Sequence, residues 1–351
     1  MSELRQDVTT REWVILAPER GKRPTQAPKK KPGGGDPGWD STCPFCPGNE
    51  VETPVETFRM PAASSGETPG WEVRAVPNRF AALTPQGDTT RTEEGPFFRK
   101  MGGFGVHEVI IETASHNTPL ALMTYEHVEK VLTTYQARYN SLKKDKRLRH
   151  ITIFKNYGWA AGTSLAHPHS QLVATPIIAP YYHRKFEVAY EYYADLGKCL
   201  YCDLIAWDLE HALKRVVAEE SEFVVVHPYA PHVPYETWIM PKTHCSSFGL
   251  FPAARLGELS RVLKDTLFCL YQGLNNPAFN LVIDSNSNDH EDDPFYHWHI
   301  RIIPRLTTIA GFELGSGIYV STALPEDTAS YMRKIARSCP GDVCIAFKDY
   351  E

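Results

Sequence analysis

The pattern of apolar residues predicts two amphipathic helices, each set among short strands. In both regions apolar residues recur every three or four positions, which is the spacing of one helix face. These positions are Val128, Val131, Leu132 and Tyr135 in the first region and Leu256, Leu259, Val262, Leu263, Leu267 and Leu270 in the second. After each helical region comes a β-prone run, TIFKN or LVIDSN, that ends at Asn156 or Asn286.

These elements belong to an internal repeat. Residues 108–116 (EVIIETASH) correspond to residues 236–244 (ETWIMPKTH), and His167-Pro-His169 corresponds to His297-Trp-His299. The offset is 128 residues for the first correspondence and 130 residues for the second. Because chance would not keep these landmarks in register, the sequence predicts two tandem copies of one α+β unit, in residues 1–178 and 179–351.

Each copy is expected to contain two strands, a helix and a third strand, followed by the His-x-His strand. Short strands joined by local turns favour an antiparallel sheet over a parallel doubly wound sheet. The predicted fold class is therefore α+β, with an antiparallel sheet and helices packed on one face.

Composition narrows the classes of function. The chain has 351 residues, 42% of them hydrophobic, with 37 basic and 42 acidic side chains and a net charge of -5. It can bury a sizeable core, and the absence of a basic excess argues against nucleic acid as a partner. The N-terminal residues are charged where a signal peptide would be apolar, and no run of apolar residues is long enough to cross a membrane. We therefore expect a cytoplasmic protein with no membrane partner.

Each copy also carries a set of metal-binding residue types, a Cys-x-x-Cys pair and two histidines. Two thiolates and two imidazoles make a closed tetrahedral zinc site, so we expect about two zinc ions per chain. Copper or iron would fit some of these ligands, and the alternative for one set alone is buried cysteines beside ordinary histidines. Finding the pattern twice favours metal. The two sets are Cys43, Cys46, His116 and His167, and Cys199, Cys202, His244 and His297.

His169 is a candidate nucleophile. It lies in residues 162–171 (GTSLAHPHSQ), where small residues allow the backbone to approach a phosphate closely. A neutral imidazole nitrogen attacks phosphorus without a separate base. The alternative is a histidine that packs in the core or supports the metal, and the surrounding segment favours the nucleophile.

These motifs together carry a resemblance to a known family. The segment His167-Pro-His169-Ser-Gln171, with Asn156, Gly158, Gly162 and Ser164 before it, resembles the active-site segment of galactose-1-phosphate uridylyltransferases. That family is the branch of the histidine-triad superfamily built from two fused copies. Further matches, spread over nearly the whole chain, are Thr10-x-x-Trp13-Val14, Arg20-Gly-Lys-Arg23-Pro24, Cys43-Pro-Phe-Cys46, Pro77-Asn78-Arg79-Phe80 and Gly311-Phe312-Glu313.

The resemblance implies a ping-pong nucleotidyl transfer. His169 would attack the α-phosphorus of a nucleotide sugar and release a sugar 1-phosphate, and an acceptor phosphate would then attack the nucleotidyl-histidine. Such catalysis depends mostly on positioning and charge stabilisation. The resemblance also implies a homodimer and a zinc ion that holds the strand carrying the nucleophile.

The resemblance assigns roles to several further residues. Gln171 would hold a non-bridging phosphate oxygen, and Arg20 and Arg23 would neutralise the diphosphate. Asn156 and Ser164 would contact phosphate and hold the loop that includes Gly162. The remaining substrate-binding residues implied by the motifs are Asn78 and Phe80, as nucleoside contacts, and Glu313.

Some residues depart from the pattern of the galactose enzymes. Arg79 stands where Asp is common, and the Gln expected to contact the hexose near Tyr319 is missing. The second Cys-x-x-Cys pair resembles that of plant-type ADP-glucose phosphorylases, whose acceptor is inorganic phosphate, whereas Pro168 is typical of the galactose enzymes. The prediction is therefore a UDP-glucose:hexose-1-phosphate uridylyltransferase, with a nucleoside-diphosphate-hexose phosphorylase as the alternative.

A different class of function is a non-catalytic, zinc-stabilised nucleotide-binding protein. The second copy illustrates the loss of chemistry, because Trp298 stands in place of Pro168 and Ile300-Arg301 in place of Ser170-Gln171. We therefore expect His299 to be a structural residue or an accessory metal ligand, and the second unit to be catalytically degenerate. The intact Gln171 in the first copy favours an enzyme.

Overall fold

The core of the molecule is one large antiparallel sheet. The computed structural model describes residues 2–22, 37–62, 70–211, 213–339 and 341. Within them, ten strands pair in the order β10-β11-β12-β14-β13-β8-β9-β7-β4-β3, and all neighbouring strands are antiparallel. The strands are β3 (Phe58–Pro61), β4 (Trp71–Pro77), β7 (Val106–Ile111), β8 (His150–Tyr157), β9 (His169–Thr175), β10 (Val216–Glu219), β11 (Phe223–Val226), β12 (Thr237–Pro241), β13 (Phe279–Asp284) and β14 (His299–Pro304).

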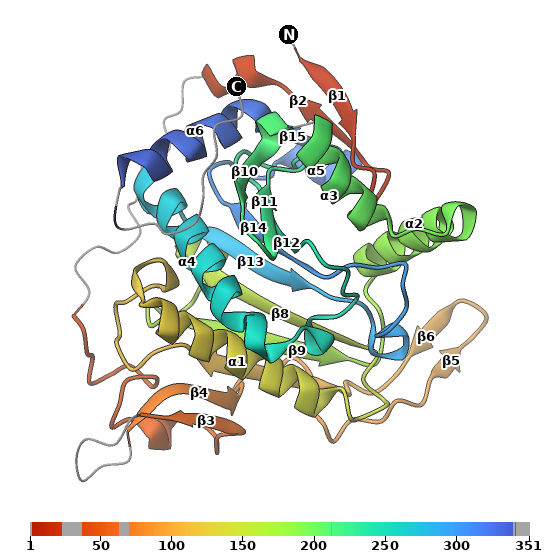
Figure 1. Cartoon of the computed structure of the whole chain (residues 1–351). Coiled ribbons are helices and arrows are strands. Elements are labelled where there is room, and N and C mark those ends of the chain that lie inside the picture. The colour runs from red at the N-terminus through yellow and green to blue at the C-terminus, as the bar shows by residue number, and fades with distance from the viewer. Residues whose placement is uncertain (1, 23–36, 63–69, 212, 340, 342–351) are drawn as a thin grey trace.

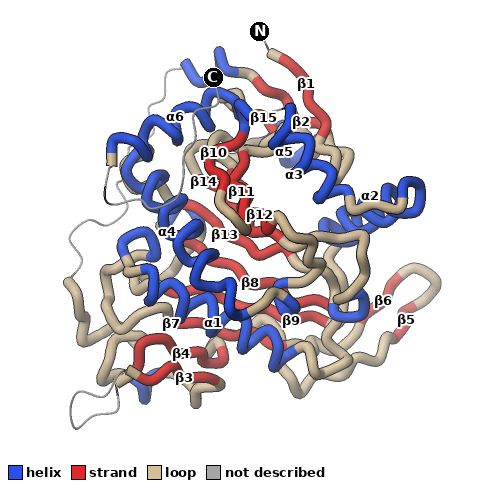
Figure 2. The backbone as a smooth tube through the Cα atoms, viewed as in Figure 1, coloured by secondary structure: helices blue, strands red, loops and turns tan. Residues whose placement is uncertain are grey.

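The same order of elements occurs on both sides of the central pair of strands. The N-terminal side runs β3, β4, β7, helix α1 (Tyr125–Leu142), β8 and β9, and the C-terminal side runs β10, β11, β12, helix α4 (Leu256–Gly273), β13 and β14. Strands β8 and β13 meet at the seam, where Tyr157 lies opposite Phe279 (Figure 2). The sheet thus has two five-stranded halves of matching order. The division of the chain at residue 178 stays a prediction.

Helices cover one face of the sheet along its length and the other face only in part. Helices α1, α4 and α6 (Pro325–Ser338) bury their apolar positions in one core against strands of both halves (Figure 1). On the opposite face, α2 (Pro180–Leu196) and α3 (Leu200–His211) pack around Trp238 and Met240 of the C-terminal half. The large sheet is antiparallel as predicted, and this second helical layer adds to the one-sided packing expected from the sequence.

The two kinds of cover explain the composition of the strands. In β11, Phe223 and Val225 face the core under α4, and Val224 faces the core under α2 and α3, so the strand is apolar on both faces. In β9, Leu172 faces the helices, whereas His169 lies on the face that α2 and α3 leave uncovered. The N-terminal half therefore offers one face of its sheet for polar side chains.

The remaining elements lie at the edges. A three-stranded sheet joins β1 (Glu3–Gln6), β2 (Trp13–Leu16) and β15 (Tyr319–Ser321), and it lies beside the C-terminal half, away from β3 and β4 (Figure 1). No helix in the described part of the chain is both long and apolar enough to cross a bilayer. The other short elements are β5 (Thr92–Glu94), β6 (Phe98–Lys100), α5 (Gly311–Ser316) and the 3-10 turns Pro18–Lys22, Glu50–Glu52, Leu120–Leu122, Trp159–Ala161, Leu213–Arg215, Phe248–Leu250, Ala253–Arg255 and Asn288–His290.

Candidate active site

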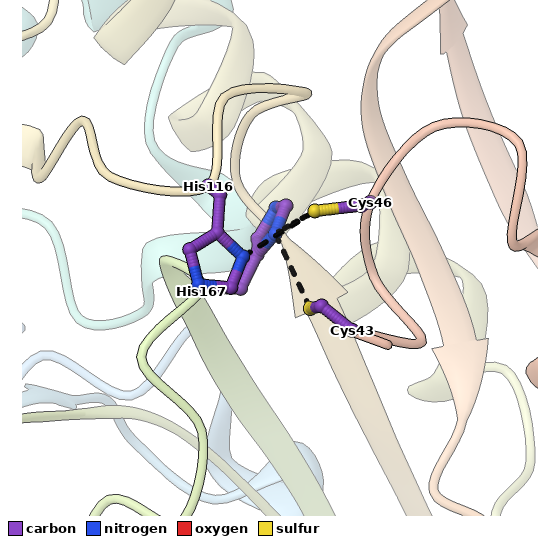
Figure 3. Close-up of side chains that lie close together, drawn as sticks. All are labelled: Cys43, Cys46, His116 and His167. Atoms are coloured by element: carbon purple, nitrogen blue, oxygen red, sulfur yellow. Dashed lines mark hydrogen bonds between the residues drawn. The ribbon is translucent and has the colours of Figure 1, made fainter. Parts of the chain in front are cut away.

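The first predicted metal set forms a compact cluster at the end of the N-terminal half. The ligand atoms of Cys43, Cys46, His116 and His167 all lie within 4.8 Å of one another, and the side chains point toward a common centre (Figure 3). The Sγ of Cys46 lies 3.3 Å from the Nδ1 of His116, and the Sγ of Cys43 lies 3.7 Å from the Nδ1 of His167. A tetrahedral zinc ion would hold sulfur and nitrogen roughly 3.5 Å apart, so the spacing fits zinc.

Hydrogen bonding and burial suit this cluster to a cation. The Nε2 of His167 donates to the carbonyl oxygen of Thr113 at 2.8 Å, which leaves Nδ1 free to bind metal. Burial lowers the pKa of His167 to about 4, so its ring is neutral at pH 7. Burial also raises the pKa of Cys43 to about 11, and a bound cation would reverse this shift because it stabilises the thiolate.

The second predicted set clusters in the same way in the C-terminal half. The Sγ of Cys202 lies 3.3 Å from the Nδ1 of His244 and 3.4 Å from the Nδ1 of His297. The Nε2 of His297 donates to a backbone oxygen, that of Pro241, at 2.9 Å, as its counterpart His167 does. With Cys199, these residues form the second group of possible metal ligands in the described residues, and His299 belongs to neither group.

His169 is the first residue of β9, and one of its two ring nitrogens is engaged in a hydrogen bond. Its Nδ1 donates to the carbonyl oxygen of His167 at 2.8 Å, so the Nε2 carries the lone pair. Burial lowers the pKa of His169, and the ammonium of Lys155 adds to the effect, so the ring is neutral. The ring of Phe45, which lies between Cys43 and Cys46 in the sequence, contacts the His169 ring edge-on at a centroid distance of 5.4 Å. The loop that contains Cys43 and Cys46 therefore also contacts the candidate nucleophile.

Two cavities meet at His169. The larger, of about 390 Å³, lies on the Gln171 side and is lined by both apolar and polar groups. The smaller, of about 230 Å³, lies on the side of Asn156 and Gly158. Predicted residues line both of them: Asn78, Phe80, Ser164 and Gln171 line the larger cavity, Asn156 the smaller, and His169 both.

The loop that borders the smaller cavity depends on two glycines. Gly158 has φ of +77°, and a Cβ there would lie 2.8 Å from the Cβ of Ala278 in the C-terminal half. Gly162 has φ of +89° and ends the short turn Trp159–Ala161. Both positions therefore require glycine, and the predicted role of Gly162 in shaping the loop is consistent with its conformation.

Sequence reasoning missed His107, which orients Gln171. The backbone N–H of Ala82 donates to the Nδ1 of His107 at 3.3 Å, so the Nε2 carries the proton and donates to the Oε1 of Gln171 at 2.8 Å. The Gln171 amide then presents its N–H groups to the cavity. Asn78 also lies beside His107, with 3.1 Å between its Nδ2 and the Nε2. The alternation of side chains along a strand could have identified His107. It sets His107 on the same face as Val109, which lines the larger cavity.

A buried ion pair beneath β9 was also missed. The Nζ of Lys155 donates to Glu112 at 2.7 Å and to the carbonyl oxygen of His169 at 3.0 Å. The other carboxylate oxygen of Glu112 accepts from the hydroxyl groups of Tyr135, at 2.9 Å, and Ser170. Every polar atom of the ion pair therefore has a partner. The bond from Lys155 to the carbonyl oxygen of His169 also fixes the backbone of the His-x-His segment.

Not all predicted substrate residues reach this site within one chain. Arg20 lies in the turn Pro18–Lys22, which follows β2, and Glu313 lies in α5, which contacts β15 of the three-stranded sheet. Neither residue lines the two cavities at His169. Arg23 lies outside the described residues.

The counterpart of His169 in the other half has a different environment. His299 is fully buried, its Nε2 lies 3.1 Å from the Nζ of Lys185 and 3.3 Å from Asp284, and its ring stacks on Trp238. Arg301, at the position that corresponds to Gln171, donates to Asp284 at 2.7 Å. Of the two roles predicted for His299, a structural residue or an accessory metal ligand, its surroundings favour the structural one.

Comparison with known proteins agrees with this geometry. A family model described as galactose-1-phosphate uridyl transferase, N-terminal domain, matches residues 1–179. ADP-glucose phosphorylase from Arabidopsis thaliana is 35% identical over 95% of this chain and 93% of its own length. Galactose-1-phosphate uridylyltransferase from Thermotoga maritima is 28% identical over 95% of this chain and 98% of its own length.

A solved structure gives the same relationship in three dimensions. The crystal structure of an ADP-glucose phosphorylase from Arabidopsis thaliana with bound ADP-glucose superimposes with a TM-score of 0.81 at 32% identity, over 95% of this chain and 98% of that chain. Sequence and fold therefore agree along almost the full length. The chain belongs to the galactose-1-phosphate uridylyltransferase family and is a nucleotidyltransferase enzyme.

Proposed function

We propose that the protein transfers a nucleoside monophosphate from a nucleotide sugar to a phosphate-bearing acceptor through His169. The observation that carries the proposal is that His169 lines two cavities and is fixed through its Nδ1, which leaves its Nε2 without that bond. One cavity has room for a nucleoside and the other for a phosphate and its substituent. This arrangement suits a covalent intermediate better than simple binding.

In the first step, the lone pair of the His169 Nε2 forms a bond to the α-phosphorus. The bond from that phosphorus to the bridging oxygen breaks, and the oxygen leaves with its electron pair as part of a sugar 1-phosphate. In the second step an acceptor oxygen attacks the same phosphorus, and the imidazole leaves as the neutral ring. The Gln171 amide, turned by His107, donates to a non-bridging phosphate oxygen as charge develops.

The donor base and the acceptor define two candidate reactions. Transfer of a uridylyl group between UDP-glucose and a hexose 1-phosphate is the reaction predicted from the sequence. Phosphorolysis of ADP-glucose is the second candidate, and it is favoured by the higher identity to the Arabidopsis phosphorylase, 35% against 28% for the Thermotoga uridylyltransferase. In both reactions the same histidine carries the nucleotidyl group.

The test is to incubate the protein separately with base-labelled UDP-glucose and base-labelled ADP-glucose. The expected result is acid-labile label on the protein from one donor, absent in His169→Asn. A chase with inorganic phosphate or with a hexose 1-phosphate then identifies the acceptor as the compound that removes the label. No label on the protein from either donor, in a fully folded preparation that binds the nucleotide sugar, would favour the non-catalytic binding protein.

We also propose that both Cys/His clusters bind zinc. Support comes from the sulfur and nitrogen spacings of both clusters and from the backbone bonds that orient His167 and His297. Zinc would tie the segment before β9 to the Cys43 loop, and it would take no part in the transfer itself. A set of free thiols suits a reducing compartment, which supports the cytoplasmic location expected from the sequence.

A homodimer would complete the substrate site. Arg20 and Glu313 lie beside the three-stranded sheet, at the end of the molecule away from β3 and β4, and they line neither cavity at His169 (Figure 1). We propose that a second copy brings these residues to His169 of the first copy. In this assignment residues 1–178 supply the nucleophile, and residues 179–351 form a catalytically degenerate unit that presents part of the partner's sugar-phosphate site.

A further inference from the structure

A pair of asparagine side chains crosses the seam between the two halves beside the reactive histidine. Asn156 of β8 lies directly opposite Asn280 of β13, and the two side chains are hydrogen-bonded. The register of β8 with β9, continued by two residues, sets Asn156 opposite His169 as well. Neighbours across a pair of strands lie on the same face of the sheet, so these groups share the face of the active site.

The orientation of the Asn280 amide follows from Arg305. The Nε of Arg305 donates to the Oδ1 of Asn280 at 2.5 Å. Because a guanidinium only donates, the oxygen of the Asn280 amide must face Arg305 and its Nδ2 must face the other way. The Nδ2 donates to two acceptors of the N-terminal half, the Oδ1 of Asn156 at 2.8 Å and the carbonyl oxygen of Ala161 at 2.9 Å.

The orientation of the Asn156 amide follows in turn. Its Oδ1 is occupied by the bond from Asn280, so its Nδ2 is the part of the amide left for a ligand in the cavity that Asn156 and His169 line. An N–H group stabilises the negative charge of a phosphate, whereas a carbonyl oxygen at the same place would repel it. The second bond from Asn280 holds Ala161, in the turn between Gly158 and Gly162.

We infer that Asn280, held by Arg305, is a positioning residue for nucleotidyl transfer. It acts through Asn156, whose amide it turns so that the N–H groups face the phosphate at His169. The inference rests on the proposed function and extends it, because it gives the catalytically degenerate half a defined task in the reaction. Gln171 is oriented by His107 on the other side of the same histidine, so both amides at His169 are turned by a neighbouring group.

Two substitutions separate positioning from packing. Asn280→Asp keeps the shape of the side chain and an acceptor for Arg305, but it has no N–H group to donate to Asn156. Asn280→Leu removes both the donor and the acceptor. Val282→Ala is the matched control, because Val282 is a half-buried residue two positions along the same strand.

The measurement is the rate at which base-labelled UDP-glucose and ADP-glucose, tested separately, label the protein in a single turnover. We expect Asn280→Asp and Asn280→Leu to slow labelling about tenfold, within the range for coupled neighbours, with a less than threefold change in the concentration for half-maximal rate. Melting temperature should stay unchanged in Asn280→Asp, and Val282→Ala should label like the unmodified protein.

A double-mutant cycle tests whether Asn280 acts through Asn156. In an Asn156→Ala background, Asn280→Asp should slow labelling by less than about twofold, because the amide that it orients is already gone. The same tenfold loss in both backgrounds, or no loss in either, would overturn the inference. Labelling that persists in His169→Asn would overturn the proposed function itself, so the two failures give different results.

Discussion

His169 and His299 occupy corresponding positions in the two halves of one sheet, but their surroundings differ. Each begins the strand that follows a histidine of a Cys/His cluster, and each donates from its Nδ1 to the carbonyl oxygen of that histidine, at 2.8 Å and 3.0 Å. His169 lines two cavities, whereas the Nε2 of His299 lies against Lys185 and Asp284. The same local backbone thus leaves one imidazole at the border of two cavities and encloses the other among side chains.

The difference comes from the cover over each half. Helices α2 and α3 lie over the C-terminal strands and supply Lys185 and Tyr201 around His299. Over the N-terminal strands, Tyr182 and Phe186 of α2 reach His150 of β8, and the smaller apolar cluster around the Cys43 loop covers strands β4 and β7. A nucleophile needs open space for its substrate, and the C-terminal half has filled that space with side chains.

The residues that lie opposite the two histidines on the neighbouring strands also differ. Continued by two residues, the register of β8 with β9 sets the uncharged Asn156 opposite His169, whereas Asp284 lies opposite His299. Burial by itself raises the pKa of Asp284, but Arg301 and Lys185 outweigh it and hold the pKa well below its ordinary value. Both cations beside His299 are already paired with Asp284, so neither is available to bind a phosphate there.

The comparison predicts its largest effect for the two histidines. His169→Asn should lower turnover by about 10⁶-fold, as expected when a nucleophile is deleted, while the zinc content and melting temperature stay near those of the unmodified protein. His299→Asn should change turnover less than tenfold and lower the melting temperature. Both are measured as turnover and thermal unfolding on the same preparations.

His169→Gly sharpens this prediction. The cavity left by the side chain could admit free imidazole, which would accept the nucleotidyl group and restore part of the transfer. No such rescue is expected at His299, because no substrate reaches that position. Near-native turnover in a metal-loaded His169→Asn preparation would contradict the assignment of the nucleophile.

The metal clusters should differ in what their loss does to activity. Cys43→Ser and Cys199→Ser should each lower the free energy of unfolding by about 5 kcal/mol, part of the roughly 10 kcal/mol that structural zinc contributes in small sites. Cys43→Ser should also slow turnover beyond the loss of folded protein, because Phe45 in the same loop contacts His169. Elemental analysis, chemical unfolding and turnover corrected for folded fraction measure these effects. Full folding in chelator with no bound zinc would contradict the prediction.

Removing the buried carboxylate of Asp284 should lower the free energy of unfolding without a separate effect on turnover. Asp284→Asn leaves Lys185 and Arg301 without their counter-charge, and we expect a loss of about 4 kcal/mol in the free energy of unfolding. Because the folded pKa of Asp284 is lowered, its contribution is present above the unfolded pKa of about 3.9 and is lost as the pH falls through the folded value. The difference in unfolding free energy between Asp284→Asn and the unmodified protein should therefore stay constant from pH 5 to pH 7. A difference that disappears near pH 5 would show that Asp284 is not held ionised.

The smallest effect is expected at His107. His107→Phe removes the N–H group that turns Gln171, and turnover should fall about tenfold, less than for loss of a group that contacts the transition state directly. His183→Phe on the exposed surface of α2 is the control and should leave turnover unchanged. A loss confined to His107→Phe would support the orienting role, and equal turnover in both variants would exclude it.

The sequence by itself determined the repeated pattern, the family and the chemistry of single segments. Val128, Val131 and Leu132 are buried in α1 as their spacing predicts, and Leu256 and Leu259 are buried in α4. The eight Cys and His residues come together in two clusters as predicted. These outcomes follow from local periodicity and from a repeat with constant register, both of which a linear sequence records.

Only the tertiary structure decided which groups surround each histidine. His107, Lys155 and Asn280 reach the site from three different strands, and no spacing in the sequence links them. The structure also separates Arg20 and Glu313 from His169, although the motifs group them by function. The physical reason is that strand register and helix cover bring together residues from 14 to 124 positions apart, and an asparagine or histidine acquires its role only from the partner that such pairing supplies.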